Sequence, residues 1–371
     1  MGVPSVQLGP TARIVGTGLI GTSLGLALRR AGWDVSLTDP SPTAAALARD
    51  LGAGELASAD DHPDLVVVAA PPDVVADVVV RQLAEHPDAV VTDVASVKSV
   101  VLQAITEAGA DLGRYVGSHP MAGRERSGAV AARADLFEGR AYVVVPSKDS
   151  TRSAVELVRR LAVDIGCQVT TMSAREHDDA VAAVSHVPQV MASLTAGRLR
   201  SLSEHSVALS GQGIRDVTRI AASDPQLWTQ ILAGNAGAVR SVLREVYDEL
   251  GETLAALEAL GDDDLIRSEA APGARKVLAS LIADGNAGQA RIPGKHGSAP
   301  TPYATVVVVV PDEPGALGRL FQHMGEAGIN LEDLHLEHAL GHPVGLAEIS
   351  VLPAAAEPLR EQLTTRGWRV H

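Results

Sequence analysis

Three glycines near the start of the chain form the pattern G-x-G-x-x-G, within Arg13–Ser23 (RIVGTGLIGTS). An apolar lead-in precedes Gly16, an amphipathic segment covers residues 19–31, and residues 33–38 predict a second strand that ends at Asp39. A glycine loop between a strand and a helix can hold a pyrophosphate against free backbone N–H groups and the positive end of the helix dipole. Asp39 can accept both ribose hydroxyls and would repel a 2′-phosphate. The pattern therefore predicts NAD as the cofactor in preference to NADP.

A histidine and a serine follow two other predicted strands. His119 lies in GSHPMAG at 117–123, directly before a proline that restricts the backbone. A neutral imidazole beside a nicotinamide can take the proton of a substrate hydroxyl, so that the carbon bearing it releases hydride. Ser96 lies in DVASVK at 93–98, where a serine is more often a helix cap than a catalytic group. We expect base chemistry at His119, with Ser96 close to the nicotinamide.

Two arginines and an aspartate share one face of a predicted helix later in the chain. Arg215, Asp216 and Arg219 lie within GIRDVTRIAASDP at 213–225. Such a set is either a surface row of ion pairs or a clamp in which arginine binds a carboxylate in a bidentate manner. His186, at 185–188 in SHVP, is likewise either a core histidine or a substrate contact. The residues alone leave both choices open.

The elements around these residues predict a doubly wound α/β domain, because strand and helix patterns alternate from the first strand onward. After the first two, strands are expected at 64–70, 89–92, 115–117 and 140–145, and helices at 19–31, 41–52, 73–84, 97–108 and 153–165. Ligands of such folds bind beyond the carboxyl ends of the strands, where the loops named above would meet. We expect the cofactor to contact Gly16, Gly18, Leu19, Ile20, Gly21, Asp39, Ala70, Pro71 and Ser96.

The whole chain divides into four predicted parts. A Rossmann-type domain at 11–172 is followed by residues 173–283, which have almost no strand signal and predict a helical substrate and dimerisation domain. Residues 284–302 are rich in glycine, proline, alanine and serine and predict a linker, although three cations leave open an ordered basic segment: Arg291, Lys295 and His296. Residues 303–371 predict a β–α–β–β–α–β order, which is the ferredoxin-like module.

Composition narrows the classes of function. The net charge of −14 argues against a nucleic-acid partner, since a phosphate backbone needs a basic surface. No apolar run is long enough to span a bilayer and the N-terminus carries no signal-peptide pattern, so we expect a cytoplasmic protein without a membrane partner. Cys167 is the only cysteine of the 371 residues, so an intrachain disulfide is excluded and a buried filler role is expected.

Several motifs, in the same order, resemble the prephenate/arogenate dehydrogenases of tyrosine biosynthesis. They are GTGLIGTS, TDVASVK at 92–98, GSHPMAG, SHVP at 185–188 and RDVTRIAASDPQLW at 215–228, and the resemblance covers roughly residues 13–261. It implies the NAD-dependent oxidative decarboxylation of prephenate to 4-hydroxyphenylpyruvate. Hydride would move to NAD while the ring carboxylate leaves as carbon dioxide, and the enzyme would need no metal.

The resemblance also implies catalytic roles. His119 takes the place of the histidine that hydrogen-bonds the ring hydroxyl, and Ser96 that of the serine that orients this histidine and the nicotinamide. Arg219 matches the arginine that binds a substrate carboxylate, with Asp216 as its orienting partner.

The substrate pocket carries one departure from the family pattern. By resemblance, His186 and Trp228 line the pocket, but many relatives have a second histidine where this chain has Gln189. Glutamine can donate and accept hydrogen bonds but cannot be cationic. The departure leaves open the choice between prephenate, a keto acid, and arogenate, an amino acid.

The C-terminal module resembles an ACT domain, the small regulatory fold that binds amino acids, in its segments DEPGAL at 312–317 and GINL at 328–331. The resemblance implies allosteric control by an aromatic amino acid, with tyrosine expected, at Asp312, Gly315, Ala316, Leu317 and Asn330. ACT domains usually pair and the helical region offers a dimer surface, so a homodimer is expected.

Three other functions compete with this reading. Arogenate dehydrogenase is the nearest, and turnover of the two substrates would separate them. A β-hydroxyacid dehydrogenase would use a catalytic lysine in its helical half, and residues 174–261 contain none. A sensor of NAD and amino acids would bind its ligands without turnover.

Overall fold

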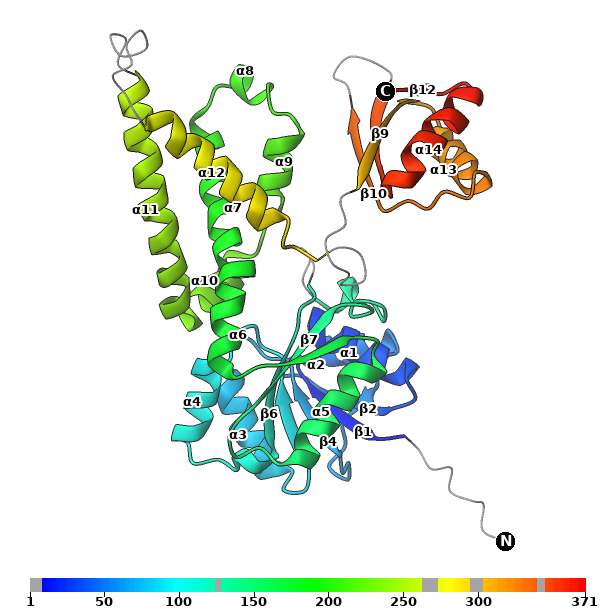
Figure 1. The fold of residues 1–371 in the computed structure, drawn as a ribbon. Coiled ribbons are helices and arrows are strands. Elements are labelled where there is room, and N and C mark those ends of the chain that lie inside the picture. Colours follow the sequence, from blue (N-terminus) through cyan, green and yellow to red (C-terminus); the bar gives the residue numbers. More distant parts are fainter. Residues whose placement is uncertain (1–8, 124–127, 262–272, 294–302, 339–343) are drawn as a thin grey trace. The chain divides into compact units, whose positions relative to one another are not determined.

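The computed structural model describes residues 9–123, 128–261, 273–293, 303–338 and 344–371. They group into two compact units. The first unit ends at Asp248, and the second begins at Glu249. Figure 1 shows an α/β part and a helical part in the first unit and a small sheet in the second. The predicted fold class, a Rossmann-type domain, a helical region and a βαββαβ module, is confirmed. No helix in the described ranges is long and apolar enough to cross a membrane.

The first unit is built around an eight-stranded sheet of order β3-β2-β1-β4-β5-β6-β7-β8. The strands are β1 (Thr11–Val15), β2 (Asp34–Thr38), β3 (Glu55–Leu56), β4 (Leu65–Val68), β5 (Val90–Asp93), β6 (Tyr115–Pro120), β7 (Ala141–Pro146) and β8 (Gln168–Thr171). The first six run parallel, β7 is antiparallel to β6, and β8 is parallel to β7. Because Val15, Val68 and Asp93 pair in register across β1, β4 and β5, the loops after these strands open at one edge.

Helices cover both faces of this sheet. One face is covered by α1 (Leu19–Arg30), α2 (Pro42–Asp50) and α5 (Arg152–Asp164), and the other by α3 (Val75–Glu85) and α4 (Ser99–Glu107). Strand β4 reads LVVV and is buried at all four positions, because helices lie above and below it. The sequence did not indicate β3, and β6 extends three residues beyond the predicted strand because β7 pairs with it as far as Pro120.

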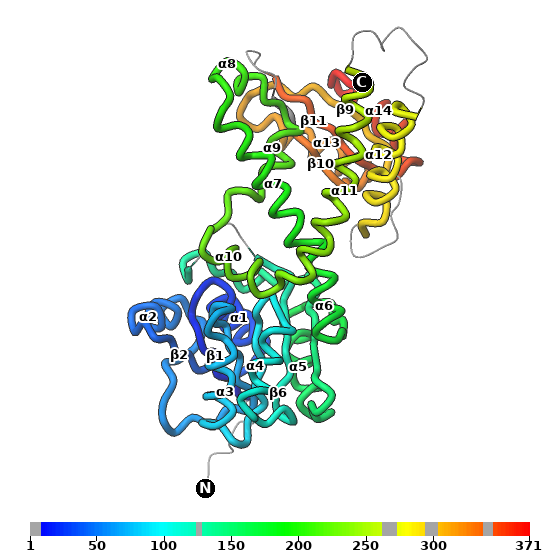
Figure 2. Tube along the Cα trace, turned by 90° about the vertical axis from the view of Figure 1, so that its left-hand side faces the viewer, coloured from blue at the N-terminus to red at the C-terminus, as the bar shows by residue number. Residues whose placement is uncertain are grey.

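The helical part of the first unit consists of α6 (Ala174–Val181), α7 (Val187–Arg198), α8 (Glu204–Val207), α9 (Gln212–Thr218), α10 (Pro225–Gly234) and the first half of α11 (Ala236–Gly261). Ser173 and Glu176 form a capping box that starts α6. A π-helical segment, Ala182–His186, joins α6 to α7, and Pro188 stands in the first turn of α7. Figure 2 shows α10 beside the sheet domain, where Trp228 and Ile231 pack against the core of the α3–α4 face.

The second unit contains α12 (Ala274–Gln289) and a four-stranded antiparallel sheet of order β10-β11-β9-β12. The elements of the module are β9 (Ala304–Pro311), α13 (Ala316–Glu326), β10 (Asp333–His338), β11 (Val344–Val351), α14 (Pro353–Thr365) and β12 (Arg369–Val370). Alternate residues of β9 and β11 are buried against the two helices, as a one-sided sheet requires.

The predicted linker starts too early, since residues 284–289 continue α12. Its Arg291 is exposed beyond this helix, while Lys295 and His296 lie outside the described residues. Within the C-terminal module the sequence predicts a strand at 329–338 and a turn at 341–343. Strand β10 begins four residues later than this prediction, at Asp333, and the predicted turn lies outside the described residues.

Candidate active site

The glycine loop forms a cradle at the carboxyl edge of the sheet. Gly16 has φ +101° and lies so close to β4 that a Cβ atom would stand 2.4 Å from the carbonyl oxygen of Ala69. A Cβ on Gly21 would stand 1.8 Å from the oxygen of Gly16, so both positions require glycine. A Cβ on Gly18 would meet no atom within 4 Å. No side chain caps α1, so its first backbone N–H groups face this open space and suit a pyrophosphate.

Hydrogen bonds hold the Asp39 side chain beside this loop. Its Oδ2 accepts hydrogen bonds from the Thr17 backbone N–H at 2.7 Å and the Thr17 hydroxyl at 2.9 Å, and its Oδ1 accepts from the Ser41 N–H at 2.8 Å. Ala70 and Pro71 follow β4 at the same edge, half-buried and exposed respectively. The hydrogen bonds therefore hold the Asp39 carboxylate at the end of β2, two strands from β4. A ribose site requires a carboxylate in this position.

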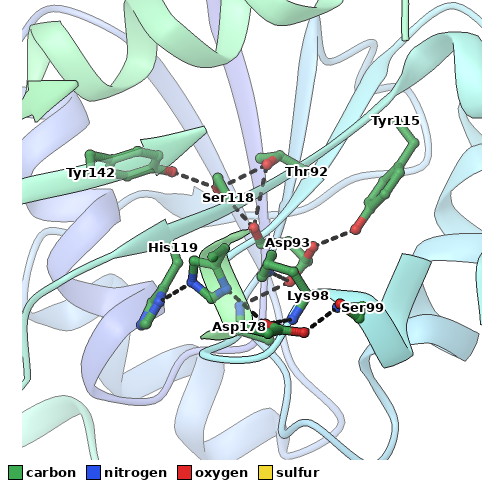
Figure 3. A network of polar contacts seen from close by, with 11 residues as sticks. Thr92, Asp93, Lys98, Ser99, Tyr115, Ser118, His119, Tyr142 and Asp178 are labelled. Carbon is green, nitrogen blue, oxygen red and sulfur yellow. Dashed lines mark hydrogen bonds and ion pairs between the residues drawn. The ribbon is translucent and has the colours of Figure 1, made fainter. Parts of the chain in front are cut away.

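His119 lies on β6, opposite Val143 of β7, and not in the loop that the sequence predicted. Its Nδ1 atom is 2.9 Å from Nε2 of His177 on α6, and Nδ1 of His177 is 2.8 Å from Oδ1 of Asp178. The two rings meet edge to face, with centroids 5.1 Å apart. Two imidazoles and a carboxylate thus form one row of hydrogen bonds (Figure 3).

The row determines which nitrogen of His119 is free. The Asp178 carboxylate only accepts, so Nδ1 of His177 carries a proton, and the other ring nitrogen of His177, Nε2, accepts from Nδ1–H of His119. The lone pair of His119 then lies on Nε2, which has no hydrogen-bond partner among the described residues. Burial, followed by the nearby His177, Lys98 and His186, holds the pKa of His119 well below its usual range. The arrangement presents a neutral base.

Asp178 also joins the helical part to the sheet domain. Its two carboxylate oxygens accept the backbone N–H groups of Lys98 at 2.9 Å and Ser99 at 2.7 Å, at the start of α4. Burial acts to raise the pKa of Asp178, but the hydrogen bonds from His177 and Ser99 outweigh it and keep the pKa below its usual range. The carboxylate that anchors the histidine row therefore stays ionised.

A fully buried ion pair lies behind this row. The Lys98 ammonium pairs with Oδ1 of Asp93, the last residue of β5, and Asp93 also accepts from the Tyr115 hydroxyl at 2.7 Å and the Ala95 N–H at 2.9 Å. Burial lowers the pKa of Lys98, while Asp93 and then Asp178 act in the opposite direction. Figure 3 shows the pair beside Asp178, on the far side from His119. It holds the loop between β5 and α4 in place.

Ser96 occupies this loop and is half-buried. In the described part of the chain its hydroxyl has no hydrogen-bond partner, and the residue on Nδ1 of His119 is His177. The orientation of His119 by Ser96 therefore stays a prediction. A place for Ser96 near the nicotinamide stays a prediction.

A second histidine, His186, stands in the π-helical segment, with 1% of its surface exposed. Its Nδ1 is 3.2 Å from the amide nitrogen of Asn235, which also donates to the backbone oxygen of Asp178 at 2.7 Å. The Trp228 ring lies edge to face with His186, 6.1 Å between centroids. Burial lowers the pKa of His186 to about 4, against an opposing effect of Asp178. The ring is neutral at pH 7.

The other residues predicted to bind the substrate are Gln189, Arg219 and Asp216. Gln189 is buried and contacts the hydroxyls of Ser193 and Ser223, at 3.3 and 3.4 Å. Arg219 is exposed on a 3-10 turn, Arg219–Ala221, that packs against α7. Asp216 accepts a hydrogen bond from Gln212 at 2.8 Å.

A separate cleft of about 150 Å³ lies in the second unit, between the turn before α13 and strands β10 and β11. Four of the residues predicted for a regulatory ligand line it: Asp312, Gly315, Ala316 and Leu317. Asn330 does not line the cleft and donates to Glu332 at 3.4 Å.

Cys167 is only partly buried. Its thiol donates to the backbone oxygen of Phe137 at 3.3 Å, and burial raises its pKa to about 12. It has the character of a packing residue with little thiolate at neutral pH.

The sequence analysis did not identify four polar residues of the site: Lys98, His177, Asp178 and Asn235. A signal for two of them was present, since His177 and Asp178 form an adjacent acid–base pair in a predicted helix nine residues before His186. A buried partner for Lys98 could have been sought within its own motif, where Asp93 is the only carboxylate.

The chain is similar to known proteins over nearly its whole length. The nucleotide-binding domain of prephenate dehydrogenase matches residues 24–171, and the dimerisation domain of prephenate dehydrogenase matches residues 173–268. A probable prephenate dehydrogenase of Streptomyces niveus, NovF, is 36% identical over 360 residues, 96% of this chain and 98% of its own. The prephenate dehydrogenase of Bacillus subtilis (strain 168) is 27% identical over 362 residues, 93% and 92% of the two chains.

A solved structure shares the fold of the larger part of the chain. Prephenate dehydrogenase from Aquifex aeolicus, in complex with hydroxyphenyl propionate and NAD+, superposes with a TM-score of 0.65 at 27% identity. The match covers 76% of this chain and 99% of that one.

Proposed function

Because the chain belongs to the prephenate dehydrogenase family, we propose that His119 is the general base with which it oxidises prephenate. The chain is an NAD+-dependent oxidoreductase of tyrosine biosynthesis. One observation carries the proposal: the hydrogen bonds from Asp178 through His177 leave a lone pair on Nε2 of His119, at the edge where the glycine loop opens.

The reaction removes a hydride, a hydroxyl proton and a ring carboxylate from prephenate. Bound NAD+ supplies the acceptor for the hydride that leaves the ring carbon bearing the hydroxyl group. His119 accepts the hydroxyl proton at Nε2, and Asp178 stabilises the resulting positive charge through His177. The ring carboxylate leaves as carbon dioxide, its bonding electrons complete the aromatic ring, and the proton returns to the ring oxygen. The product is 4-hydroxyphenylpyruvate, and no net proton is consumed.

The glycine loop is proposed to hold the cofactor. The open space at Gly18 and the uncapped start of α1 support a pyrophosphate there, and the fastened carboxylate of Asp39 supports a ribose site. The proposed contacts are Gly16, Gly18, Leu19, Ile20, Gly21, Asp39, Ala70, Pro71 and Ser96.

The side chain of the substrate is assigned to the helical part. Arg219 would bind a carboxylate, since a guanidinium presents paired donors to it. His186, Gln189 and Trp228 would line the pocket, and the edge-to-face contact of His186 with Trp228 supports this. Asp216 has Gln212 as its partner here, so its role beside Arg219 rests on the family resemblance alone.

A homodimer is proposed, with the helical part as its interface. The family's dimerisation domain matches this part, and an apolar groove of about 500 Å³ runs along α7, α10 and α11. Tyr247, with 65% of its surface exposed, lines the groove together with Val239 and Leu243. A second copy of the chain would cover this apolar surface.

Allosteric control by an aromatic amino acid, with tyrosine expected, is proposed for the second unit. The cleft before α13 combines the first N–H groups of a helix, suited to a carboxylate, with Asp312 and Glu313, suited to an ammonium group. An amino acid carries both charges.

The experiment is NADH formation with prephenate and with arogenate, using NAD+ and NADP+, each with and without tyrosine. Turnover of prephenate with NAD+, reduced by tyrosine, is expected. Turnover of arogenate alone would move the substrate assignment to the amino acid, and an unchanged rate in saturating tyrosine would refute tyrosine as the effector.

A further inference from the structure

The amide of Asn235 has only one orientation that satisfies its contacts. Its nitrogen lies 2.7 Å from the backbone oxygen of Asp178, which can only accept, so this atom is the NH2 group. Asn235 is 6% exposed and stands between α10 and α11, where both its neighbours are helical. A buried amide held in this way has its second N–H fixed in direction as well.

That second N–H points at His186. The Asn235 nitrogen is 3.2 Å from Nδ1 of His186, so Nδ1 must supply a lone pair. A neutral imidazole with an unprotonated Nδ1 carries its proton on Nε2. His186 is therefore a hydrogen-bond donor through Nε2, the opposite of His119, whose Nε2 accepts.

The Nε2–H of His186 still reaches accessible space. It has no hydrogen-bond partner among the described residues. In that part of the chain, the polar side-chain atoms that are fully enclosed and lack a partner belong to Arg13 and Gln82. Nε2 of His186 is not one of them, so it is not fully enclosed. His186 lies close enough to His119 to influence its titration, and the Trp228 ring closes one side. A substrate group beside His186 thus meets a single, directed donor.

We propose that Asn235 is a positioning residue that fixes His186 as an Nε2–H donor and thereby favours a substrate whose side chain offers oxygen acceptors over one that offers an ammonium group. The inference rests on the proposed function. Prephenate presents a keto oxygen and a carboxylate, which accept from Nε2–H, whereas the ammonium group of arogenate would place its own N–H groups against that donor. The choice between a keto acid and an amino acid is set in part by a residue that does not touch the substrate.

The test has a spectroscopic arm and a kinetic arm, both on the full-length chain. The ¹⁵N signals of histidine rings distinguish protonated from unprotonated nitrogens, and the His186 signals are identified by their loss in His186→Gln. We expect Nε2 protonated and Nδ1 unprotonated at pH 7.5. In Asn235→Asp, the carboxylate should draw a proton to Nδ1.

The kinetic arm compares kcat/KM for prephenate and arogenate. Asn235→Asp should lower the value for prephenate by about tenfold to a hundredfold, mainly through KM, and narrow the preference over arogenate by a similar factor. Asn286→Asp, on the exposed surface of α12, makes the same chemical change and should alter neither value. His186→Gln retains an N–H donor and should keep much of the preference, and Asn235→Asp added to it should then have little effect on the ratio.

Three results would overturn the proposal: a wild-type His186 protonated at Nδ1, equal losses for both substrates in Asn235→Asp, or a full loss of preference in Asn235→Asp with Nδ1 still unprotonated. If Asn235→Asp does not fold, two measurements still test the proposal: the protonation of His186 in the wild-type ¹⁵N spectrum, and the substrate preference of His186→Gln. Absence of prephenate turnover in the wild type would refute the proposed function instead, since the ¹⁵N spectrum is read without turnover.

Discussion

The polar cluster at the sheet edge and the core of the C-terminal sheet bury their side chains by opposite means. In the first, Asp93, Lys98 and Asp178 each have named partners at hydrogen-bond distance. In the second, alternate residues of β9 and β11 are apolar and pack against α13 and α14. Hydrogen bonds have direction and fix where protons lie, whereas apolar contacts fix only shape and volume.

From this contrast we expect substitutions in the two regions to change different properties of the enzyme. Changes in the polar cluster should alter the chemistry as well as the stability, because the same bonds orient the proposed base. Changes in the apolar core should lower stability and leave the chemistry of the first unit intact. Four measurements test this separation.

The largest effect is expected for His119→Asn. Asparagine cannot take up the hydroxyl proton, so kcat for prephenate should fall by about 10²- to 10⁴-fold, the size of a general-base contribution. NADH formation measures this, and the temperature of thermal unfolding should fall by a smaller amount, because Nε2 of His177 loses its ring partner. His205→Asn, at an exposed position on α8, is the matched control. Turnover within a few-fold of the wild type would remove His119 from the base position.

Lys98→Met should act on both stability and chemistry. It leaves the buried Asp93 carboxylate without its cation, and the expected loss of unfolding free energy is about 3–5 kcal/mol. The loop that presents the start of α4 to Asp178 should loosen, so kcat should fall too. Urea unfolding and NADH formation measure the two effects. Lys148→Met, on the surface of the same unit, should change neither, and a stable Lys98→Met enzyme would show that the ion pair contributes little.

Ile349→Ala should act on stability alone. The side chain is fully buried on β11, and truncation in a core costs about 2–5 kcal/mol of unfolding free energy. The second unit should unfold at lower urea concentration, while kcat without effector stays at its wild-type value. A large drop in this basal kcat would contradict the separation of the two regions.

The smallest effect is in the pH profile. The base must be unprotonated, so activity is lost as the pH falls through the pKa of His119, and burial places this pKa well below 6.5. An ordinary histidine would be half protonated at pH 6.5. We therefore expect kcat/KM to stay nearly constant between pH 7.5 and 6.5 and to decline only below. A midpoint at or above 6.5 would show that the surroundings do not favour the neutral ring.

Local sequence patterns were sufficient for most strands of the sheet and for the glycine loop, but not for β3. Gly16 and Gly21 lie where the motif requires them, because strand, turn and helix are encoded by neighbouring residues. The partners of His119 could not be found in this way. His177 is 58 residues away and Asp178 is 80 residues from Lys98, so these contacts depend on how α6 docks onto α4. The extension of β6 to Pro120 likewise depends on the reversed direction of β7.

The contact of Asp178 with the start of α4 has a consequence for how such enzymes can be recombined. The nucleotide-binding half contributes His119 and Ser99, but the carboxylate that completes the base comes from the helical half. A chimera joined near residue 172 would inherit its cofactor site from one parent and the orientation of its base from the other. Crossover points after α6 would transfer His177 and Asp178 together with α4, whose first backbone N–H groups bind the Asp178 carboxylate, and hybrids of that design should retain turnover where the earlier junction loses it.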